Sequence, residues 1–120
     1  MKTMLVIALL SAPTLALFQP QEAAKPKYTI EEVMEKAHKE KLMKKVLSGD
    51  ASQEEKLALL DLYLSLPENK PPKGDEKEWN RRATEVVVAA ARVVAEREGS
   101  LKQLKKVANC TACHKAHKGK

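Results

Sequence analysis

Apolar residues recur at helical spacing along most of the chain, in segments that open with polar capping residues and end at helix breakers. In the first segment Thr29 and Glu32 form a capping-box pattern, in which each side chain can bond a free backbone N–H of the other. The sequence Ser48-Gly49-Asp50 then interrupts the pattern. This predicts a first helix over residues 29–47, with its apolar face formed by Ile30, Val33, Met34 and Ala37.

A second capping box, formed by Ser52 and Glu55, predicts a second helix that Pro67 closes. Its leucines fall mainly on the face of Leu57, Leu60 and Leu64, with Leu59, Leu62, Tyr63 and Leu66 beside it. Three prolines in residues 67–74 then indicate a stiff crossover rather than a tight turn.

Asp75 opens a third predicted helix, which ends at Gly99. Ser100 caps a fourth helix, which carries both cysteines of the chain. The third helix buries an apolar stripe of Trp79, Ala83, Val86, Val87, Ala90, Val93 and Val94. The fourth holds Leu101, Leu104, Val107 and Ala108. Because helix formers (Ala, Leu, Lys, Glu) dominate and only four residues are aromatic, the fold class is predicted to be all-α, an antiparallel four-helix bundle.

The first 16 residues have the pattern of an export signal. Lys2 precedes a short apolar run, and Thr14 and Ala16 suit the −3 and −1 positions of a signal-peptidase site. The run is too short to serve as a membrane span in the mature protein. We therefore expect residues 1–16 to be removed, 17–28 to be a lead-in, 29–117 to form the helical domain, and 118–120 to be a basic tail. The expected location is the periplasm or another exported compartment.

The formal net charge is +6, but acidic residues are spread along the chain and no Arg-rich arm is present. Basic composition alone is weak evidence for nucleic-acid binding, so nucleic acid is not an expected partner. The lysines do gather around the end of the fourth helix, at Lys102, Lys105, Lys106, Lys115, Lys118 and Lys120. Such a basic rim predicts an acidic protein partner.

The most specific motif is Cys-x-x-Cys-His, formed by Cys110, Cys113 and His114. Two thiols three positions apart on a helix lie on roughly one face and can add to the two vinyl groups of one haem. The adjacent His114 then supplies its imidazole to the iron.

Three other interpretations of the motif are a disulfide oxidoreductase, a zinc site and an ordinary cysteine pair. The first normally follows a strand in a βαβ unit, and no strand is predicted here. The second would crowd Cys110, Cys113, His114 and His117 into eight residues. One covalent haem c is favoured because the export signal, the motif and the helical pattern agree.

A helical bundle with this motif in its last helix resembles the class II c-type cytochromes, the family of cytochrome c prime and its low-spin, methionine-ligated relatives. The resemblance implies that Cys110 and Cys113 anchor the haem and that His114 is the proximal ligand. It also leaves homodimer formation open. The family often has an aromatic residue soon after the motif and an Arg in the first helix, where this chain has His117 and Glu31-Glu32, so propionate contacts are not transferred.

In the low-spin relatives a Met of the first helix binds the other side of the iron. Met34 lies inside the apolar stripe and is the first candidate for sixth ligand. His38, about 40° further round the helix, is the second candidate, and Met43 points about 180° away from Met34. An empty sixth site is the remaining option. His117 is expected to be a neighbour of solvent or of a propionate, and Trp79 and Tyr63 are expected to be packing aromatics.

No acid, base or nucleophile constellation is visible, so the chain is not predicted to be an enzyme. The expected function is that of an exported mono-haem c-type cytochrome that carries single electrons between redox partners. The alternatives are a gas-binding, cytochrome c prime-like protein with an open sixth site, and a zinc-stabilised or metal-free helical interaction module.

Overall fold

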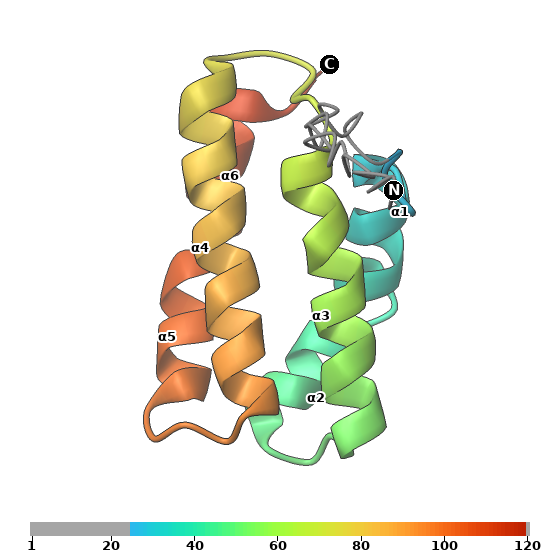
Figure 1. The fold of residues 1–120 in the computed structure, drawn as a ribbon, viewed down its shortest axis with the longest axis vertical. Coiled ribbons are helices and arrows are strands. Elements are labelled where there is room, and N and C mark those ends of the chain that lie inside the picture. Colours follow the sequence, from blue (N-terminus) through green and yellow to red (C-terminus); the bar gives the residue numbers. More distant parts are fainter. Residues whose placement is uncertain (1–24, 120) are drawn as a thin grey trace, which may run out of the picture.

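The computed structural model describes residues 25–119, and this part of the chain is helical with no β-strand (Figure 1). The predicted all-α class is therefore confirmed. The export signal and most of the lead-in lie outside the described residues. The elements are α1 (Ile30–Val33), the π-helix η1 (Met34–Lys39), α2 (Leu42–Ser48), α3 (Gln53–Glu68), α4 (Glu76–Val94), α5 (Ser100–Val107) and α6 (Cys110–His117).

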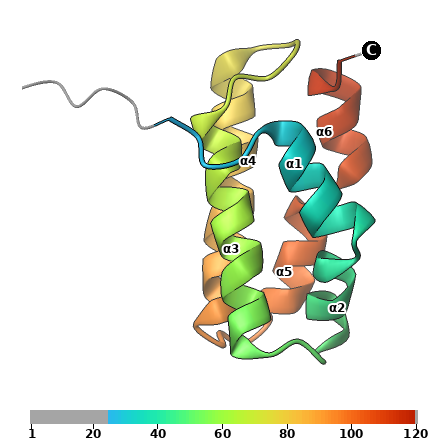
Figure 2. The same ribbon diagram turned by 90° about the vertical axis from the view of Figure 1, so that its right-hand side faces the viewer.

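Helices α3 and α4 lie side by side and run in opposite directions, joined by the Pro-rich crossover (Figure 1). The segment α1–η1–α2 packs along α3, and α5 packs along α4. The turned view shows α6 beyond the end of α5, on the side of the molecule that carries α1 and α2 (Figure 2). Helices α1 and α2 thus lie on the same side of the α3–α4 pair as α6 (Figure 2).

The predicted capping boxes at Thr29 and Ser52 are both confirmed, with reciprocal bonds to Glu32 and Glu55. At Thr29 the hydroxyl accepts from the Glu32 N–H at 3.1 Å, and the Thr29 N–H donates to the Glu32 carboxylate at 2.8 Å. These bonds satisfy N–H groups that the first turn of a helix leaves free.

The prediction of one continuous helix over residues 29–47 is wrong. After Val33 the backbone widens into η1, and the Glu40 N–H donates to the Glu35 carbonyl, five residues earlier. Lys41 then adopts a left-handed conformation with φ 64° before α2 begins. Because the π-turns and this single left-handed residue change the rotation of the chain, side chains beyond His38 do not point where a regular helix would send them.

The buried face of α3 is formed by the residues beside the predicted leucine face. Leu59, Leu62, Tyr63 and Leu66 are buried, whereas Leu57 and Leu64 are 47% and 42% exposed. Pro67 lies within the last turn of α3, which runs one residue further, to Glu68. The stripe predicted for α4 is largely confirmed: its buried apolar residues are Trp79, Ala83, Val86, Ala89, Ala90 and Val93.

Polar bonds link the start of α1, the end of α3 and the start of α4. The buried Trp79 Nε1 donates to the Leu66 and Asn69 carbonyls, each at 3.0 Å. The Asn69 amide donates to the Tyr28 carbonyl at 2.8 Å, and the Tyr28 N–H donates to the Ser65 hydroxyl at 3.2 Å. These bonds replace the contacts with water that the carbonyls and the hydroxyl lose on burial.

The fourth predicted helix is broken in two. At Ala108 and Asn109 the backbone leaves the helical region, and Asn109 becomes the N-cap of α6. Its side-chain oxygen accepts from the backbone N–H groups of Thr111 and Ala112, at 3.0 and 3.3 Å. The short side chain of Asn can bond backbone N–H groups that would otherwise bond helix carbonyls, so a helix can stop and restart at Asn. Cys110 is therefore the first residue of a separate short helix. No helix within residues 25–119 has the length and apolar character needed to cross a membrane.

Candidate functional site

The Cys-x-x-Cys-His motif occupies most of α6. Both cysteines are free thiols; Cys110 is exposed, and Cys113 is half-buried against the core. Burial raises the pKa of the Cys113 thiol, an effect that the positive charge of Arg82 opposes. His114 is exposed. The motif thus offers two reduced sulfurs and one accessible imidazole on consecutive turns of one helix.

His38 lies on η1, which contacts α3. Its ring is half-buried, and its Nε2 lies 3.3 Å from the hydroxyl of Tyr63. Burial lowers the pKa of His38, and the positive charge of His114 lowers the pKa further. The pKa of His38 on η1 thus responds to a charge on α6.

Tyr63 connects His38 to Met43. The Tyr63 side chain is buried, and its hydroxyl donates to the Met43 sulfur at 2.9 Å. Burial raises the pKa of Tyr63 above its usual value, and the negative charge of a Cys110 thiolate raises this pKa further. We refer to His38, Tyr63 and Met43 as the distal cluster, because the Tyr63 hydroxyl joins them and none of them lies on α6.

The expected orientation of Met43, away from the interior, is wrong. Met43 is half-buried, packs against the core and contacts Tyr63. The error follows from extending a regular helix through η1 and Lys41, where the chain turns differently. Tyr63 was expected to be an aromatic that packs in the core or against the haem, and no local sequence signal indicates its polar contacts. Met34, the first candidate for sixth ligand, is half-buried and packs against the core.

His117 is buried, so the first of its two expected surroundings, solvent, is wrong, and a haem propionate stays a prediction. Its Nδ1 lies 3.2 Å from the Lys73 carbonyl, and its ring meets Trp79 edge-on with centroids 5.4 Å apart. The other ring nitrogen, Nε2, is buried and has no hydrogen-bond partner in the described part of the chain. The last turn of α6 is thereby fixed to the crossover and to the start of α4.

The residues of the zinc interpretation do not assemble. Within residues 25–119 no three His, Cys, Asp or Glu side chains come together as a set that could hold a metal ion. Cys110 is exposed at the start of α6, whereas His117 is buried at its end against Trp79.

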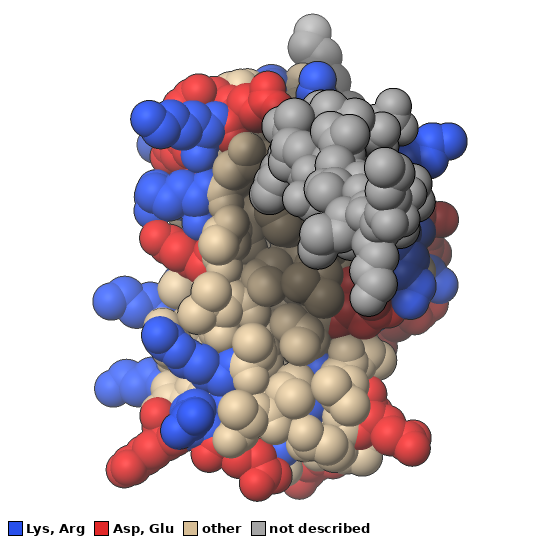
Figure 3. Space-filling view, in the orientation of Figure 1, with Lys and Arg blue, Asp and Glu red and all other residues tan. Residues whose placement is uncertain are grey.

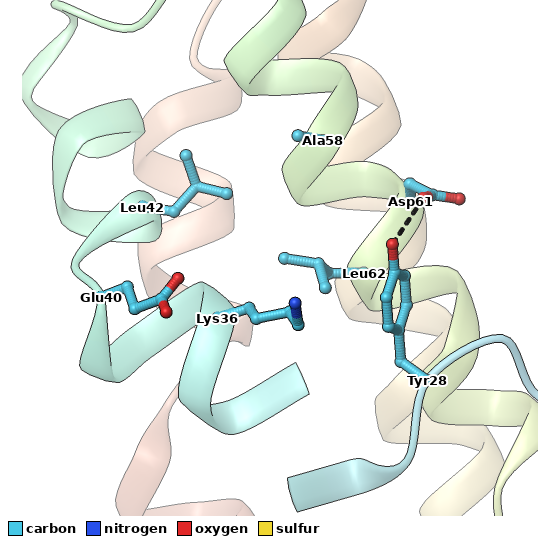
Figure 4. A pocket seen from close by; sticks show the side chains of 7 residues that line it. All are labelled: Tyr28, Lys36, Glu40, Leu42, Ala58, Asp61 and Leu62. Atoms are coloured by element: carbon cyan, nitrogen blue, oxygen red, sulfur yellow. Dashed lines mark hydrogen bonds between the residues drawn. The ribbon is translucent and has the colours of Figure 1, made fainter. Parts of the chain in front are cut away.

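A pocket of about 280 Å³ lies elsewhere, between η1 and α3 (Figure 4). Polar groups gather at its rim, where the Tyr28 hydroxyl donates to Asp61 at 3.4 Å. Its lining is Tyr28, Lys36, Glu40, Leu42, Ala58, Asp61 and Leu62. Neither the motif nor the distal cluster contributes to it, so it is separate from the candidate haem site.

The surface lysines of the last two helices are all exposed, namely Lys102, Lys105, Lys106, Lys115 and Lys118. Lys120 lies outside the described residues. In the orientation of Figure 1, uncharged side chains cover much of the face over α3 and α4, and charged side chains gather at its margins (Figure 3). Leu57 and Leu64 of α3 and Val88 of α4 are large apolar side chains that remain exposed.

The donor set fits a covalently attached haem. Two free thiols suit thioether formation, exposed His114 suits iron ligation, and the distal cluster presents a second imidazole from a different element. No family model, curated protein or solved structure matches this chain.

Proposed function

We propose that this chain is an exported mono-haem c-type cytochrome that carries single electrons. In this proposal α1–η1–α2 and α5–α6 each form one interrupted rod, and together with α3 and α4 they make an antiparallel four-helix bundle around the haem. The observation that carries the proposal is the Cys-x-x-Cys-His motif on α6, where two free thiols stand in one short helix with an exposed His114. A second imidazole, that of His38, is supplied by a separate element, η1.

Each residue of the motif has a defined task. Cys110 and Cys113 would each add to one haem vinyl group: the S–H bond and the π bond of the vinyl group would break, one C–S and one C–H bond would form, and no external oxidant would be needed. His114 would supply a nitrogen ligand to the iron. The haem supplies the change of one electron between ferric and ferrous iron.

The rest of the chain tunes this chemistry. The apolar wall of α3 and α4, including Leu59, Leu62 and Ala83, keeps water from the interior. Burial and hydrogen bonding around a haem are among the protein's means of setting its reduction potential. The exposed lysines of α5 and α6 lie next to the motif in the sequence and attract an acidic redox partner.

The experiment is to export the full-length chain from a bacterium that has haem-attachment machinery and to measure intact mass and visible spectrum. We expect one haem, retained after denaturation in acidic organic solvent. The Cys110→Ala/Cys113→Ala variant should lose covalent attachment, whereas the matched Thr111→Ala variant on the same helix should keep it. Wild-type protein with no covalent haem would overturn the proposal and favour the interaction module. A haem that is high-spin and binds CO would favour the gas-binding alternative.

A further inference from the structure

The cysteines and histidines of α6 share one face of this helix. Cys110, Cys113, His114 and His117 follow one another at intervals of three, one and three residues, and α6 is a regular α-helix from the first of them to the last. At about 100° per residue, all four fall within an arc of about 100°. A haem held by both thioethers and by His114 therefore lies against the face that also carries His117.

His117 is the buried member of this set, and one of its ring nitrogens has no partner. The side chain is 2% exposed. Its Nδ1 lies 3.2 Å from the Lys73 carbonyl oxygen, which can only accept, so Nδ1 carries the hydrogen of this bond. Nε2 is buried and meets no hydrogen-bond partner within residues 25–119. Because buried polar atoms are nearly always hydrogen-bonded, Nε2 indicates a polar group that this part of the chain does not supply.

The His117 ring is held by two other elements. Trp79 of α4 meets it edge-on with centroids 5.4 Å apart, and the Trp79 Nε1 is itself bonded to the carbonyls of Leu66 and Asn69. The crossover lies so close to the ring that a Cβ atom on Gly74 would stand 2.7 Å from the His117 Nδ1. Nε2 therefore has a set direction, and the ring cannot turn toward a new protein partner without breaking these contacts.

The haem supplies a polar group of the right kind. Its polar substituents are two propionates, which lie on the half of the porphyrin opposite the vinyl groups. Along α6 the two cysteines come first, His114 follows, and His117 comes about one turn later. This order matches the order of vinyl groups, iron and propionates across the haem. One hydrogen shared between an imidazole nitrogen and a carboxyl oxygen gives both buried atoms a partner.

We infer that His117 is a haem-binding residue, whose Nε2 shares a hydrogen bond with a haem propionate. This inference rests on the proposed function and deepens it, because it adds a contact to the carboxyl end of the haem. The Lys73 carbonyl and Trp79 then position the imidazole, so the crossover becomes part of the haem site. The neighbouring Lys115 and Lys118 are exposed, and water can satisfy them, whereas the buried Nε2 has no such alternative.

The test uses haem-loaded protein and two substitutions that each keep one half of the imidazole. His117→Asn keeps an N–H donor near the position of Nδ1 and so keeps the bond to Lys73, whereas His117→Gln keeps one near the position of Nε2. The readout is the propionate bending frequency in the resonance Raman spectrum, which rises with hydrogen bonding. We expect the wild-type frequency in His117→Gln and a lower one in His117→Asn. Lys118→Gln, a control at an exposed neighbour, should leave the frequency unchanged.

A second measurement needs only wild type and so does not depend on whether a variant folds. In NMR spectra of the ferrous protein, taken as the CO complex if the haem is high-spin, we expect nuclear Overhauser effects between the ring hydrogens that flank the His117 Nε2 and the propionate methylene hydrogens. Absence of these effects, or an unchanged Raman frequency in His117→Asn, overturns the inference while the proposed function stands. A frequency that falls in Lys118→Gln but not in His117→Asn assigns the propionate to Lys118 and also overturns it. Absence of covalent haem in wild type overturns both.

Discussion

Gly74 lies so close to His117 that a Cβ atom on Gly74 would stand 2.7 Å from the His117 Nδ1. The same Cβ would be 2.5 Å from the Ala116 carbonyl oxygen, a backbone atom that cannot move aside easily. Gly74 also has φ +87°, which side-chain-bearing residues rarely adopt. The crossover between α3 and α4 therefore approaches α6 closely only because residue 74 is glycine, and this contact helps to hold the helix that carries the motif.

Gly74→Ala should destabilise the protein more than Gly49→Ala does. Gly49 has nearly the same conformation, φ +85°, but no atom lies within 4 Å of its Cβ position. We expect Gly49→Ala to cost about 1–2 kcal/mol from backbone strain alone. Gly74→Ala adds a steric term of roughly 1–3 kcal/mol. Urea unfolding of both variants measures the difference, and equal losses would show that the contact between the crossover and α6 is unimportant.

Removal of the Asn109 side-chain cap should loosen α6. Asn109→Ala loses the bonds to the N–H groups of Thr111 and Ala112, and loss of a cap costs about 0.5–2 kcal/mol. Hydrogen exchange of these two amides should accelerate, while exchange in α4 stays unchanged. Asn109→Asp keeps an acceptor oxygen and should protect the amides nearly as well as wild type does. Fast exchange in Asn109→Asp, or slow exchange in Asn109→Ala, would contradict the capping role.

The stability of the haem-free chain should depend on pH through His38. Because burial lowers the pKa of His38, the unfolded chain binds a proton there at a higher pH than the folded protein does. The contribution of His38 to the free energy of unfolding is therefore fully present above about pH 6.5. It falls as the pH drops toward the pKa of His38 in the folded protein, and below that pKa it changes no further. His38→Gln should remove this component. Urea unfolding of wild type and His38→Gln between about pH 7.5 and about pH 5 measures the difference. Parallel plots of the free energy of unfolding against pH would contradict burial of His38.

Much of the local structure could be predicted because its signals are short-range. The capping residues Thr29, Ser52 and Asp75 all act as N-caps, and the stripe of α4 from Trp79 to Val93 is buried as expected. The leucines of α3 indicated its buried face less clearly, because the apolar residues of this helix occur on most of its faces. Which of its faces is buried depends on the neighbours it meets, and the sequence of α3 alone does not specify them.

The two broken helices explain what the sequence did not predict about the site. Lys41 adopts a left-handed conformation without a glycine to signal it, and nothing in residues 34–39 marks a π-helix. The change of rotation there brings Met43 to Tyr63. Asn109 was a recognisable capping residue, but it lies inside a segment whose spacing fits a continuous helix. Cys110, Cys113 and His114 became candidates through their motif, and His38 through its place on the first helix. The contacts of Tyr63 with His38 and Met43 required the fold.

The exposed lysines of α5 and α6 should make electron transfer sensitive to the charge of the reaction partner. We expect the reduced, haem-loaded protein to react with ferricyanide, an anion, at a rate that falls as salt is added. With hexaammineruthenium(III), a cation, the rate should rise with salt, because screening weakens repulsion as it weakens attraction. Lys105→Glu/Lys106→Glu should slow ferricyanide reduction at low ionic strength. The variant and wild type should converge near 1 M salt, where the screening length is about 3 Å. Stopped-flow absorbance with both oxidants measures these rates. If neither rate responds to salt or to the double substitution, the lysines are an ordinary solvated surface, and electrons leave the haem by another face.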